Sequence, residues 1–416
     1  MRRIILFIII TGIYFCNGIF AQVNKIYTPL EIQQAIKNNT RSIDGKPGRK
    51  YWHNKAEYKI EVEIDTSKRT LNGTEEIKYF NNSPDTLKQI IIRLYPDLYK
   101  KGNARDWDLD VKEIGDGTNI TSLAINGIQQ NKIDTLSRQT TNLIIPLNEK
   151  LMPGGSIQFK INWNYKFQTV FPYKEGIYSD NSYFVAYWYP QIAVYDDIDK
   201  WDDFYYKGVI DHYTDFSDYD VSITVPKEYV VWATGLLQNP EEVLSKNYLD
   251  KYLSALKSDE IVSVINAQDR KAGGITIQKE KNIWHFKTDN VPDFVFGTSA
   301  VHLWDLTSLI VDKKTGRRSI IGTAFKENTR FQFNITGMAK KTIDFLSTEL
   351  PGVPYPFPSF TVFEGSGACE FPMMTNVGPY SGEWLNIHSL SHEITHSYFP
   401  FYMGFNERKY ACMDKD

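Results

Sequence analysis

Two long stretches of this chain alternate strictly between apolar and polar residues, and this period of two constrains the fold more than any other feature. The apolar members are Tyr58, Ile60, Val62 and Ile64 in the first stretch, and Ile157, Phe159, Ile161, Trp163 and Tyr165 in the second. Successive side chains of a β-strand point to opposite faces, so each stretch predicts a strand with one face in a core. Shorter strand-like pieces, separated by Gly, Asn, Asp and Pro clusters, occur at 89–95, 142–147, 221–225, 229–233 and 275–278. We therefore expect a β-rich N-terminal domain over residues 51–300, built as a sandwich or saddle of sheets.

Two segments interrupt this pattern. Residues 241–270 have apolar side chains every fourth position, at Leu244, Tyr248, Tyr252 and Leu256, which predicts a helical insertion. Residues 183–201 are dense in aromatic side chains and carry an acidic run at Asp196, Asp197 and Asp199. We favour a core role for the aromatic residues and a polar loop for the acidic run, with a cation site as the alternative.

Beyond residue 300 the pattern changes to mixed helix and strand. Strands are predicted at 319–324 and 360–363, and a helix at 337–350 whose apolar face carries Ala339, Ile343, Leu346 and Leu350. A loop and edge strand at 364–374 then lead to a further helix. Residues 301–416 are therefore expected to form a second, α+β domain.

The first residues predict export. A cationic start, Met1-Arg2-Arg3, precedes an apolar run over 4–15 and a small residue at Ala21, so residues 1–21 are predicted to be a cleaved signal peptide. The apolar run is too short for a comfortable membrane span. Lipidation at Cys16 is the alternative, although Phe15 is bulky for that processing. We expect a periplasmic or extracellular protein with a polar leader over 22–50 that forms a strap or a short helix around 29–37.

Composition excludes several classes of protein. Hydrophobic residues make up 42% of the 416 residues and charged residues 23%, so a packed core is expected rather than disorder. A net charge of −3 indicates neither nucleic acid nor an acidic surface as a partner. After the predicted signal only Cys369 and Cys412 remain, so no disulfide framework supports the fold.

The sequence His392-Glu393-Ile394-Thr395-His396 carries the strongest chemical prediction. Two histidines four residues apart on a helix lie on one face, so both imidazoles can reach one metal ion, for which Zn²⁺ is the expected choice. Glu393 would lie on the neighbouring flank, where a carboxylate can take a proton from metal-bound water. His388 lies eight residues from His396, about 12 Å along the axis, too far for a third ligand. A solvated or hydrogen-bonded histidine pair is the alternative.

A second motif adds a family resemblance. The segment Gly367-Ala368-Cys369-Glu370-Phe371-Pro372-Met373-Met374, followed some twenty residues later by the histidine motif, resembles the M1 family of zinc aminopeptidases, the gluzincins that include the leukotriene A4 hydrolases. The resemblance covers roughly residues 50–416.

This resemblance implies a thermolysin-like catalytic domain over 301–416, incomplete at its end. It implies zinc bound by His392 and His396, Glu393 as the catalytic base, and peptides with a free N-terminus as substrates. It also implies substrate binding by Gly367, Ala368 and Glu370, with the Glu370 carboxylate holding the amino terminus. This chain has Cys369 and Phe371 where the family has Met and Asn.

The third zinc ligand departs from the family. The family has a glutamate nineteen residues after the second histidine, and this chain has Lys415 there, between Asp414 and Asp416. A lysine ammonium cannot bind zinc, and a catalytic zinc normally has three protein ligands. Asp414, Asp416 and Glu407 are the candidate replacements. The alternatives to a peptidase are a catalytically dead peptide-binding module and a truncated fragment.

Overall fold

The computed structural model describes residues 27–168, 174–179, 181–210, 213–327, 334–380 and 382–413. The predicted signal peptide and the candidate ligands Asp414 and Asp416, with Lys415, lie outside the described residues. The chain divides into two compact units, one of Met1–Trp52 with Asp197–Asp199 and one of His53–Asp196 with Lys200–Asp416. Each unit is described by itself below.

Among its described residues, the first unit contains one short helix, α2 (Leu30–Lys37), close to the predicted 29–37. Glu31 lies in its first turn and Lys37 in its last, which suits the helix dipole. The Arg41 guanidinium donates to both carboxylate oxygens of Asp197, at 2.7 and 3.1 Å. Asp197 therefore forms an ion pair with an arginine, in agreement with the polar loop that we favoured over a cation site.

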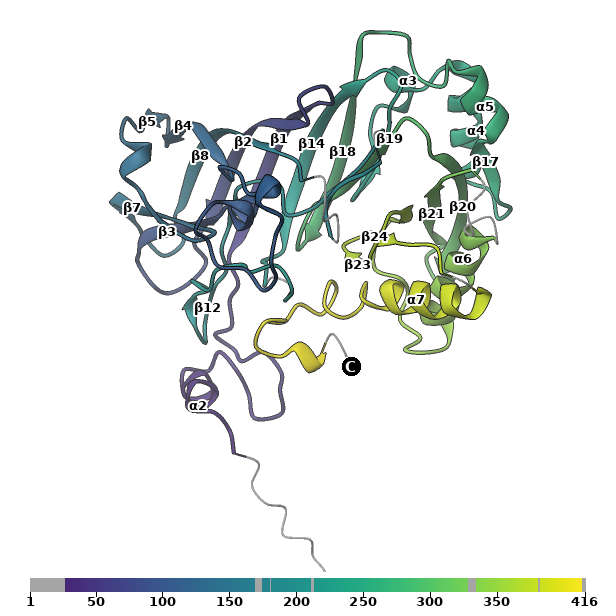
Figure 1. Ribbon diagram of the computed structural model, residues 1–416. Coiled ribbons are helices and arrows are strands. Elements are labelled where there is room, and N and C mark those ends of the chain that lie inside the picture. The colour runs from purple at the N-terminus through teal and green to yellow at the C-terminus, as the bar shows by residue number, and fades with distance from the viewer. Residues whose placement is uncertain are drawn as a thin grey trace, which may run out of the picture. The chain divides into compact units, whose positions relative to one another are not determined.

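The largest element of the second unit is an eight-stranded sheet (Figure 1). Its strands lie in the order β16 (Leu236–Leu237), β18 (Lys281–Val291), β14 (Ser217–Pro226), β1 (Lys55–Asp65), β2 (Thr70–Phe80), β8 (Ser156–Lys166), β4 (Asn119–Ile125) and β5 (Ile128–Gln129). The β1–β14 pair is parallel and the other pairs are antiparallel. The apolar members of both alternating stretches are buried, as predicted.

Two four-stranded sheets and a hairpin complete the β-rich part. Their strands are β15 (Val230–Ala233), β19 (Phe296–Ser299), β10 (Ser182–Val185) and β9 (Gly176–Ser179); β11 (Gln191–Ile192), β3 (Leu87–Arg93), β7 (Asn142–Leu151) and β6 (Ser137–Gln139); and β12 (Tyr195–Asp196) with β13 (Lys200–Trp201). Short 3₁₀ helices are η1 (Tyr95–Tyr99), η2 (Val111–Glu113), η3 (Ile133–Thr135) and η5 (Ala411–Met413). Tyr187, Trp188 and Tyr189 are buried, which confirms the core role predicted for the aromatic stretch.

The predicted helical insertion is only partly helical. It contains α3 (Pro240–Val243), α4 (Lys246–Ala255) and α5 (Ala267–Ala272), but β17 (Val262–Ile265) lies between the last two helices. The buried Val264 and Ile265 explain the strand, since β-branched side chains pack well in a sheet. The strand predicted at 275–278 is wrong: only an isolated bridge between Leu244 and Thr276 forms there, after two glycines at positive φ.

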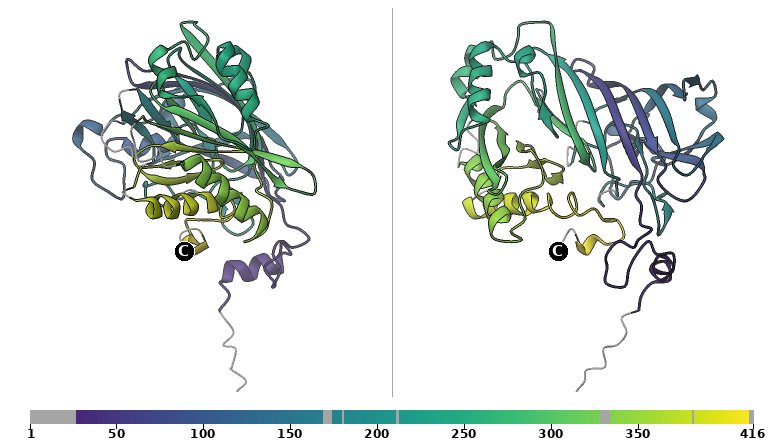
Figure 2. Two further views of the ribbon diagram at one scale, coloured as in Figure 1. Left: turned by 90° about the vertical axis from the view of Figure 1, so that its right-hand side faces the viewer. Right: turned by 180° about the vertical axis from the view of Figure 1, so that it is seen from behind.

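A six-stranded sheet carries the two longest of the described helices (Figure 2). Its order is β17, β20 (Leu303–Asp312), β21 (Arg317–Phe325), β22 (Ser359–Glu364), β24 (Met374–Val377) and β23 (Ala368–Phe371), with β21–β22 and β22–β24 parallel. Helix α6 (Ile335–Thr348) packs against β20 and β21, and α7 (Glu383–Thr395) packs against α6, β23 and β24.

The helix predicted at 337–350 is confirmed as α6, with Ala339, Ile343 and Leu346 buried. Leu350 was wrongly placed on its buried face: it lies beyond the helix end and is 69% exposed. The cause is Pro351, which disfavours helical backbone in the residue before it. The boundary between residues 300 and 301 stays a prediction.

The described helices include none that combines the length and the apolar character needed to cross a membrane.

Candidate active site

Helix α7 holds the histidine motif. Asn386 stabilises its start, because its side chain accepts from the Tyr380 N–H and donates to the Tyr380 and Gly382 carbonyls. The helix ends at Thr395, with His396 as the capping residue. Leu390 and Ile394 are buried within the helix, and Tyr398 is buried beyond it.

The two imidazoles point their Nε2 atoms toward each other. The Nε2 atoms of His392 and His396 lie 3.2 Å apart, and the ring planes are 88° apart. Two nitrogen ligands of a tetrahedral zinc ion lie about 3.4 Å apart, from bonds of about 2.1 Å. The pair therefore fits two ligands of one ion with little adjustment.

A hydrogen bond fixes the orientation of His396. Its Nδ1 lies 3.1 Å from the Phe399 carbonyl oxygen. A carbonyl only accepts, so we assign the proton to Nδ1, which leaves a lone pair on Nε2. Metal-binding histidines commonly donate their other ring N–H in this way. His396 is buried, whereas His392 is exposed.

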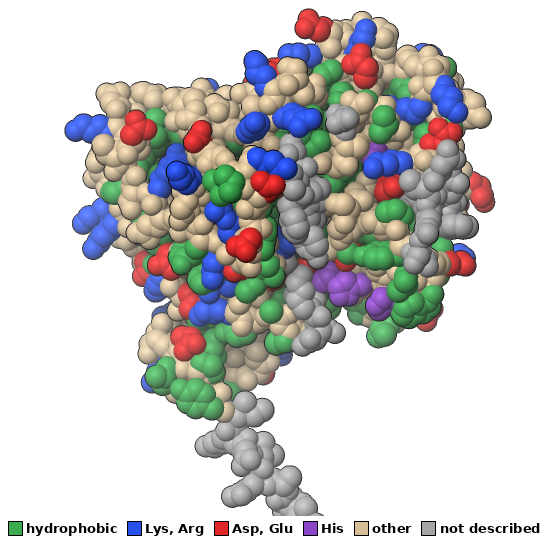
Figure 3. Space-filling model, in the orientation of Figure 1, with side chains coloured by type: hydrophobic (Ala, Val, Ile, Leu, Met, Phe, Trp, Pro, Cys, Tyr) green, Lys and Arg blue, Asp and Glu red, His purple; other side chains and the backbone are tan. Residues whose placement is uncertain are grey.

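Two carboxylates lie beside His396, whereas His392 does not belong to the same close group. Ligand atoms of Glu370, Glu393 and His396 are all within 4.8 Å of one another, and the three side chains are buried. Across the described parts of the chain, no other group of three such residues meets this distance. Glu407, a candidate third ligand, is buried but does not belong to the group. Figure 3 shows histidine side chains at the surface on this side of the molecule, bordered by hydrophobic ones.

His388 does not join the site. Its ring stacks on that of Trp384, with centroids 5.2 Å apart and planes 4° apart. Both side chains are exposed. This placement agrees with our exclusion of His388 as a ligand.

Strand β23 brings Glu370 to the histidines. Ala368 and Glu370 share one face of the strand, and Cys369 and Phe371 the other. The Phe371 ring packs against Phe184, at a centroid distance of 5.4 Å, so the other face is part of the aromatic core. Among the described strands β23 is the last of its sheet, and it pairs with β24. An edge strand of this kind can pair with an extended peptide.

Asn376 on β24 supports this strand from behind. It pairs with Cys369, and its side-chain amide donates to the Tyr178 hydroxyl. Burial raises the pKa of Tyr178, so its hydroxyl stays protonated. A Cβ at Gly365 would lie 1.8 Å from the Asn376 Oδ1, so glycine is required where the chain approaches β23. Sequence reasoning missed Tyr178 and Asn376, because nothing local links residues 198 positions apart.

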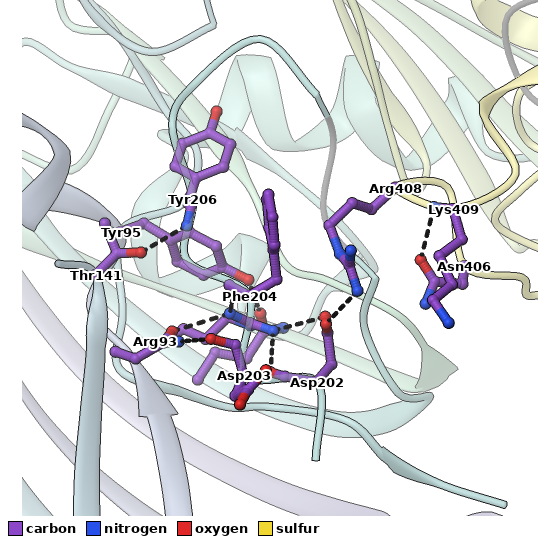
Figure 4. Close-up of polar contacts among 12 residues, drawn as sticks. Arg93, Tyr95, Thr141, Asp202, Asp203, Phe204, Tyr206, Asn406, Arg408 and Lys409 are labelled. Carbon is purple, nitrogen blue, oxygen red and sulfur yellow. Dashed lines mark hydrogen bonds and ion pairs between the residues drawn. The ribbon is translucent and has the colours of Figure 1, made fainter. Parts of the chain in front are cut away.

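A buried ion-pair cluster, Arg93–Asp202–Arg408, holds the segment that follows α7 (Figure 4). Asp202 accepts from Arg93 at 2.7 Å and from Arg408 at 2.9 Å, and the Arg408 guanidinium lies 4.3 Å from the centre of the Phe204 ring. Arg93 and Asp202 are almost fully buried. The cluster was not predicted. The one hint in the sequence is Asp202, a further acidic residue close to the run at 196–199. Nothing in the sequence indicates that Arg93 and Arg408 are its partners.

Comparison with known proteins gives matches by structure. No family model and no curated protein matches this sequence. The M1 zinc metallopeptidase of Deinococcus radiodurans matches with a TM-score of 0.51 and 12% identity over 83% of this chain and 64% of that one. A variant of an M1 zinc metallopeptidase from the same organism gives 0.52 and 12% over 86% and 67%.

A third match is more distant in length. Legionella pneumophila aminopeptidase A, in complex with aspartic acid, gives a TM-score of 0.52 and 10% identity over 82% of this chain and 33% of that one. The chain thus spans about two thirds of the Deinococcus proteins and a third of the Legionella protein. At these identities the comparison concerns the fold. The chain has the mixed β and α+β fold of the M1 zinc metallopeptidases.

Proposed function

We propose that this chain is a zinc metallopeptidase of the aminopeptidase type, which acts on peptides with a free N-terminus. His392 and His396 are the zinc ligands, Glu393 is the general base, and Glu370 binds the peptide's ammonium group. One observation carries the proposal: two Nε2 atoms lie 3.2 Å apart, and one of them, on His396, has two buried carboxylates from separate elements close to it. The shared fold supports it. The predicted signal peptide supports action after export.

The chemistry divides between the two carboxylates. When bound, zinc would make a water molecule more acidic and polarise the scissile carbonyl. Glu393 takes the proton from the attacking water and returns it to the leaving amine. Glu370 holds the ammonium group by charge-assisted hydrogen bonds. The backbone of Gly367, which precedes β23, and of Ala368, its first residue, lies along the peptide and aligns its first peptide bond.

One departure favours a second candidate. The family's third ligand position is Lys415, and Glu407 lies outside the carboxylate group beside the histidines. A site with too few ligands binds zinc weakly and can still bind peptides through Glu370. A peptide-binding module without turnover is therefore the second candidate.

Three measurements on the purified protein separate the candidates. We expect about one zinc per chain, hydrolysis of an aminoacyl anilide, and no hydrolysis of the N-acetylated anilide. Glu393→Gln should lower kcat by about 10²–10⁴-fold, the usual value of a general base. Glu383→Gln, an exposed position in the first turn of the same helix, is the matched control and should match wild type.

The outcomes are distinct. Binding of free-amine peptides without hydrolysis, lost on N-acetylation, would establish the peptide-binding module. Protein with neither zinc nor turnover nor amine-dependent binding contradicts both candidates.

A further inference from the structure

We propose that Glu370 has two positions in the reaction cycle. It is a ligand of the metal while no peptide is bound, and it moves to the ammonium group when a peptide binds. This inference rests on the proposed function, because it assumes zinc at His392 and His396. It assigns to Glu370 a role that amine binding alone does not include.

The first argument is the number of ligands. Two histidines are one ligand short of the usual three for a catalytic zinc. Among the described residues, Glu370 and Glu393 are the carboxylates whose ligand atoms lie within 4.8 Å of each other and of a His396 ring nitrogen. Glu393 follows His392 on the same helix and leaves the axis about 100° away from it. Glu370 comes from β23, a separate element, and can approach the ion from another side.

The second argument is reach. The ligand atoms of Glu370 and His396 are at most 4.8 Å apart. Two ligands of a tetrahedral zinc lie about 3.4 Å apart, so Glu370 needs to move about 1.4 Å at most toward His396. Rotation about the three side-chain torsions of glutamate covers this distance. His392 is not in the group that lies within 4.8 Å, so the approach to its ring requires a larger movement. The backbone can stay in place, held by Phe371 in the aromatic core and by β24.

The third argument is electrostatic. Glu370 is 8% exposed, so its charge interacts with few water molecules and strongly with a nearby cation. While no peptide is bound, a divalent metal ion would be the strongest positive charge near this carboxylate. A peptide brings its own ammonium group, which competes for the same carboxylate through charge-assisted hydrogen bonds. Binding of a free amino terminus then releases one metal position, and an acetylated terminus does not.

The test measures metal binding rather than activity. Zinc affinity is obtained by competition with a chelator of known affinity, on the full protein in its wild-type form, Glu370→Gln, Glu370→Asp and Glu383→Gln. We expect Glu370→Gln to weaken zinc binding at least tenfold, Glu370→Asp to restore part of the loss, and Glu383→Gln to match wild type. Circular dichroism of each protein shows that the fold is kept.

A second readout follows the release of the ligand. In the Co²⁺-substituted protein the visible absorption reports the coordination sphere. We expect L-leucinamide, which has a free amine, to change the wild-type spectrum, and N-acetyl-L-leucinamide to leave it unchanged. Glu370→Gln should show no change with either compound.

The failures can be told apart. Equal zinc affinity in wild type and Glu370→Gln, or a loss found in Asp414→Asn or Asp416→Asn instead, overturns the inference. If Glu370→Gln keeps zinc and only raises KM, Glu370 binds the amine alone and the proposed function stands. If the wild-type protein binds neither zinc nor Co²⁺, the proposed function itself fails.

Discussion

At the residue scale, Glu75 is the most unusual side chain outside the site. It lies on the buried face of β2, between Ile60 of β1 and Ile161 of β8, and is 0% exposed. Neither carboxylate oxygen has a hydrogen-bond partner among the described residues. Burial raises the pKa of Glu75 well above its usual value, because it disfavours the charged carboxylate.

Replacement of Glu75 by a side chain of similar size should therefore stabilise the protein. We expect Glu75→Leu to raise the free energy of unfolding by about 1–3 kcal/mol, the usual cost of a buried polar group without partners. Urea unfolding at pH 7 measures it. Glu76→Gln, at the next and exposed position, is the control and should change little. A destabilised Glu75→Leu would mean that the carboxyl has a partner.

Two more buried carboxyls predict the pH dependence of stability. Burial raises the pKa of Asp293 to about 7 and that of Glu175 to about 8. Both values exceed those of the unfolded chain, so the folded state binds more protons at neutral pH. Their contribution to stability is complete below about pH 4 and is lost as the pH rises through 7 and 8. Thermal unfolding between pH 5 and 9 should show a falling Tm, and Asp293→Asn should flatten the slope.

At the element scale, the alternation of apolar and polar residues predicted a strand only where the buried face of that strand is apolar. It located β1 and β8, but not β2, which lies between them, because Gly73 and Glu75 occupy buried positions there. Gly73 is required by the Trp163 ring, since a Cβ would lie 2.4 Å from it. This is a contact between strands, so no pattern within β2 indicates it.

The candidate site follows the same distinction. His392, Glu393 and His396 were predictable because one helical turn brings them together. The approach of Glu370 came from the resemblance and not from spacing, because β23 and α7 meet through tertiary packing. The Arg93–Asp202–Arg408 cluster joins three distant parts of the chain, and no local pattern predicts such a contact.

That cluster makes a prediction about the segment after α7. Asp202→Asn leaves Arg93 buried without its counter-charge, which costs about 3–5 kcal/mol. Arg408→Leu removes only the half-exposed partner and should cost less. We expect Asp202→Asn to speed proteolysis at 405–413 more than at β-rich segments. If residues 405–413 were cut no faster in Asp202→Asn and Arg408→Leu than in the wild type, other contacts would hold this segment.

At the scale of the whole molecule, the surface around α7 is unusually apolar for a water-facing helix. Trp384 is 70% exposed and Leu385 and Ile387 are 41% and 42% exposed, with Met403 at 59% beyond the helix end. Neighbouring exposed apolar side chains of this size mark a contact surface or an aggregation risk.

We therefore expect concentration-dependent association of the purified protein. Analytical ultracentrifugation should show a larger species as concentration rises, and Trp384→Ser with Ile387→Ser should reduce it. Ile128→Ser, at an exposed apolar position on β5 of the eight-stranded sheet, is the control. Association that the double variant leaves unchanged would place the contact elsewhere.

The position of β23 at the edge of its sheet has a consequence for the length of the product. Under the proposed function, the Glu370 carboxylate bound to the ammonium group and the histidine pair mark two points along an extended peptide, and the separation between them would decide how many residues precede the cut. Ala368 lies on the same face, about 6.8 Å further along the strand. Under the proposed function, an acidic side chain at 368 with alanine at 370 would match a peptide register shifted by two residues, so the spacing along this short strand would set the length of the released product.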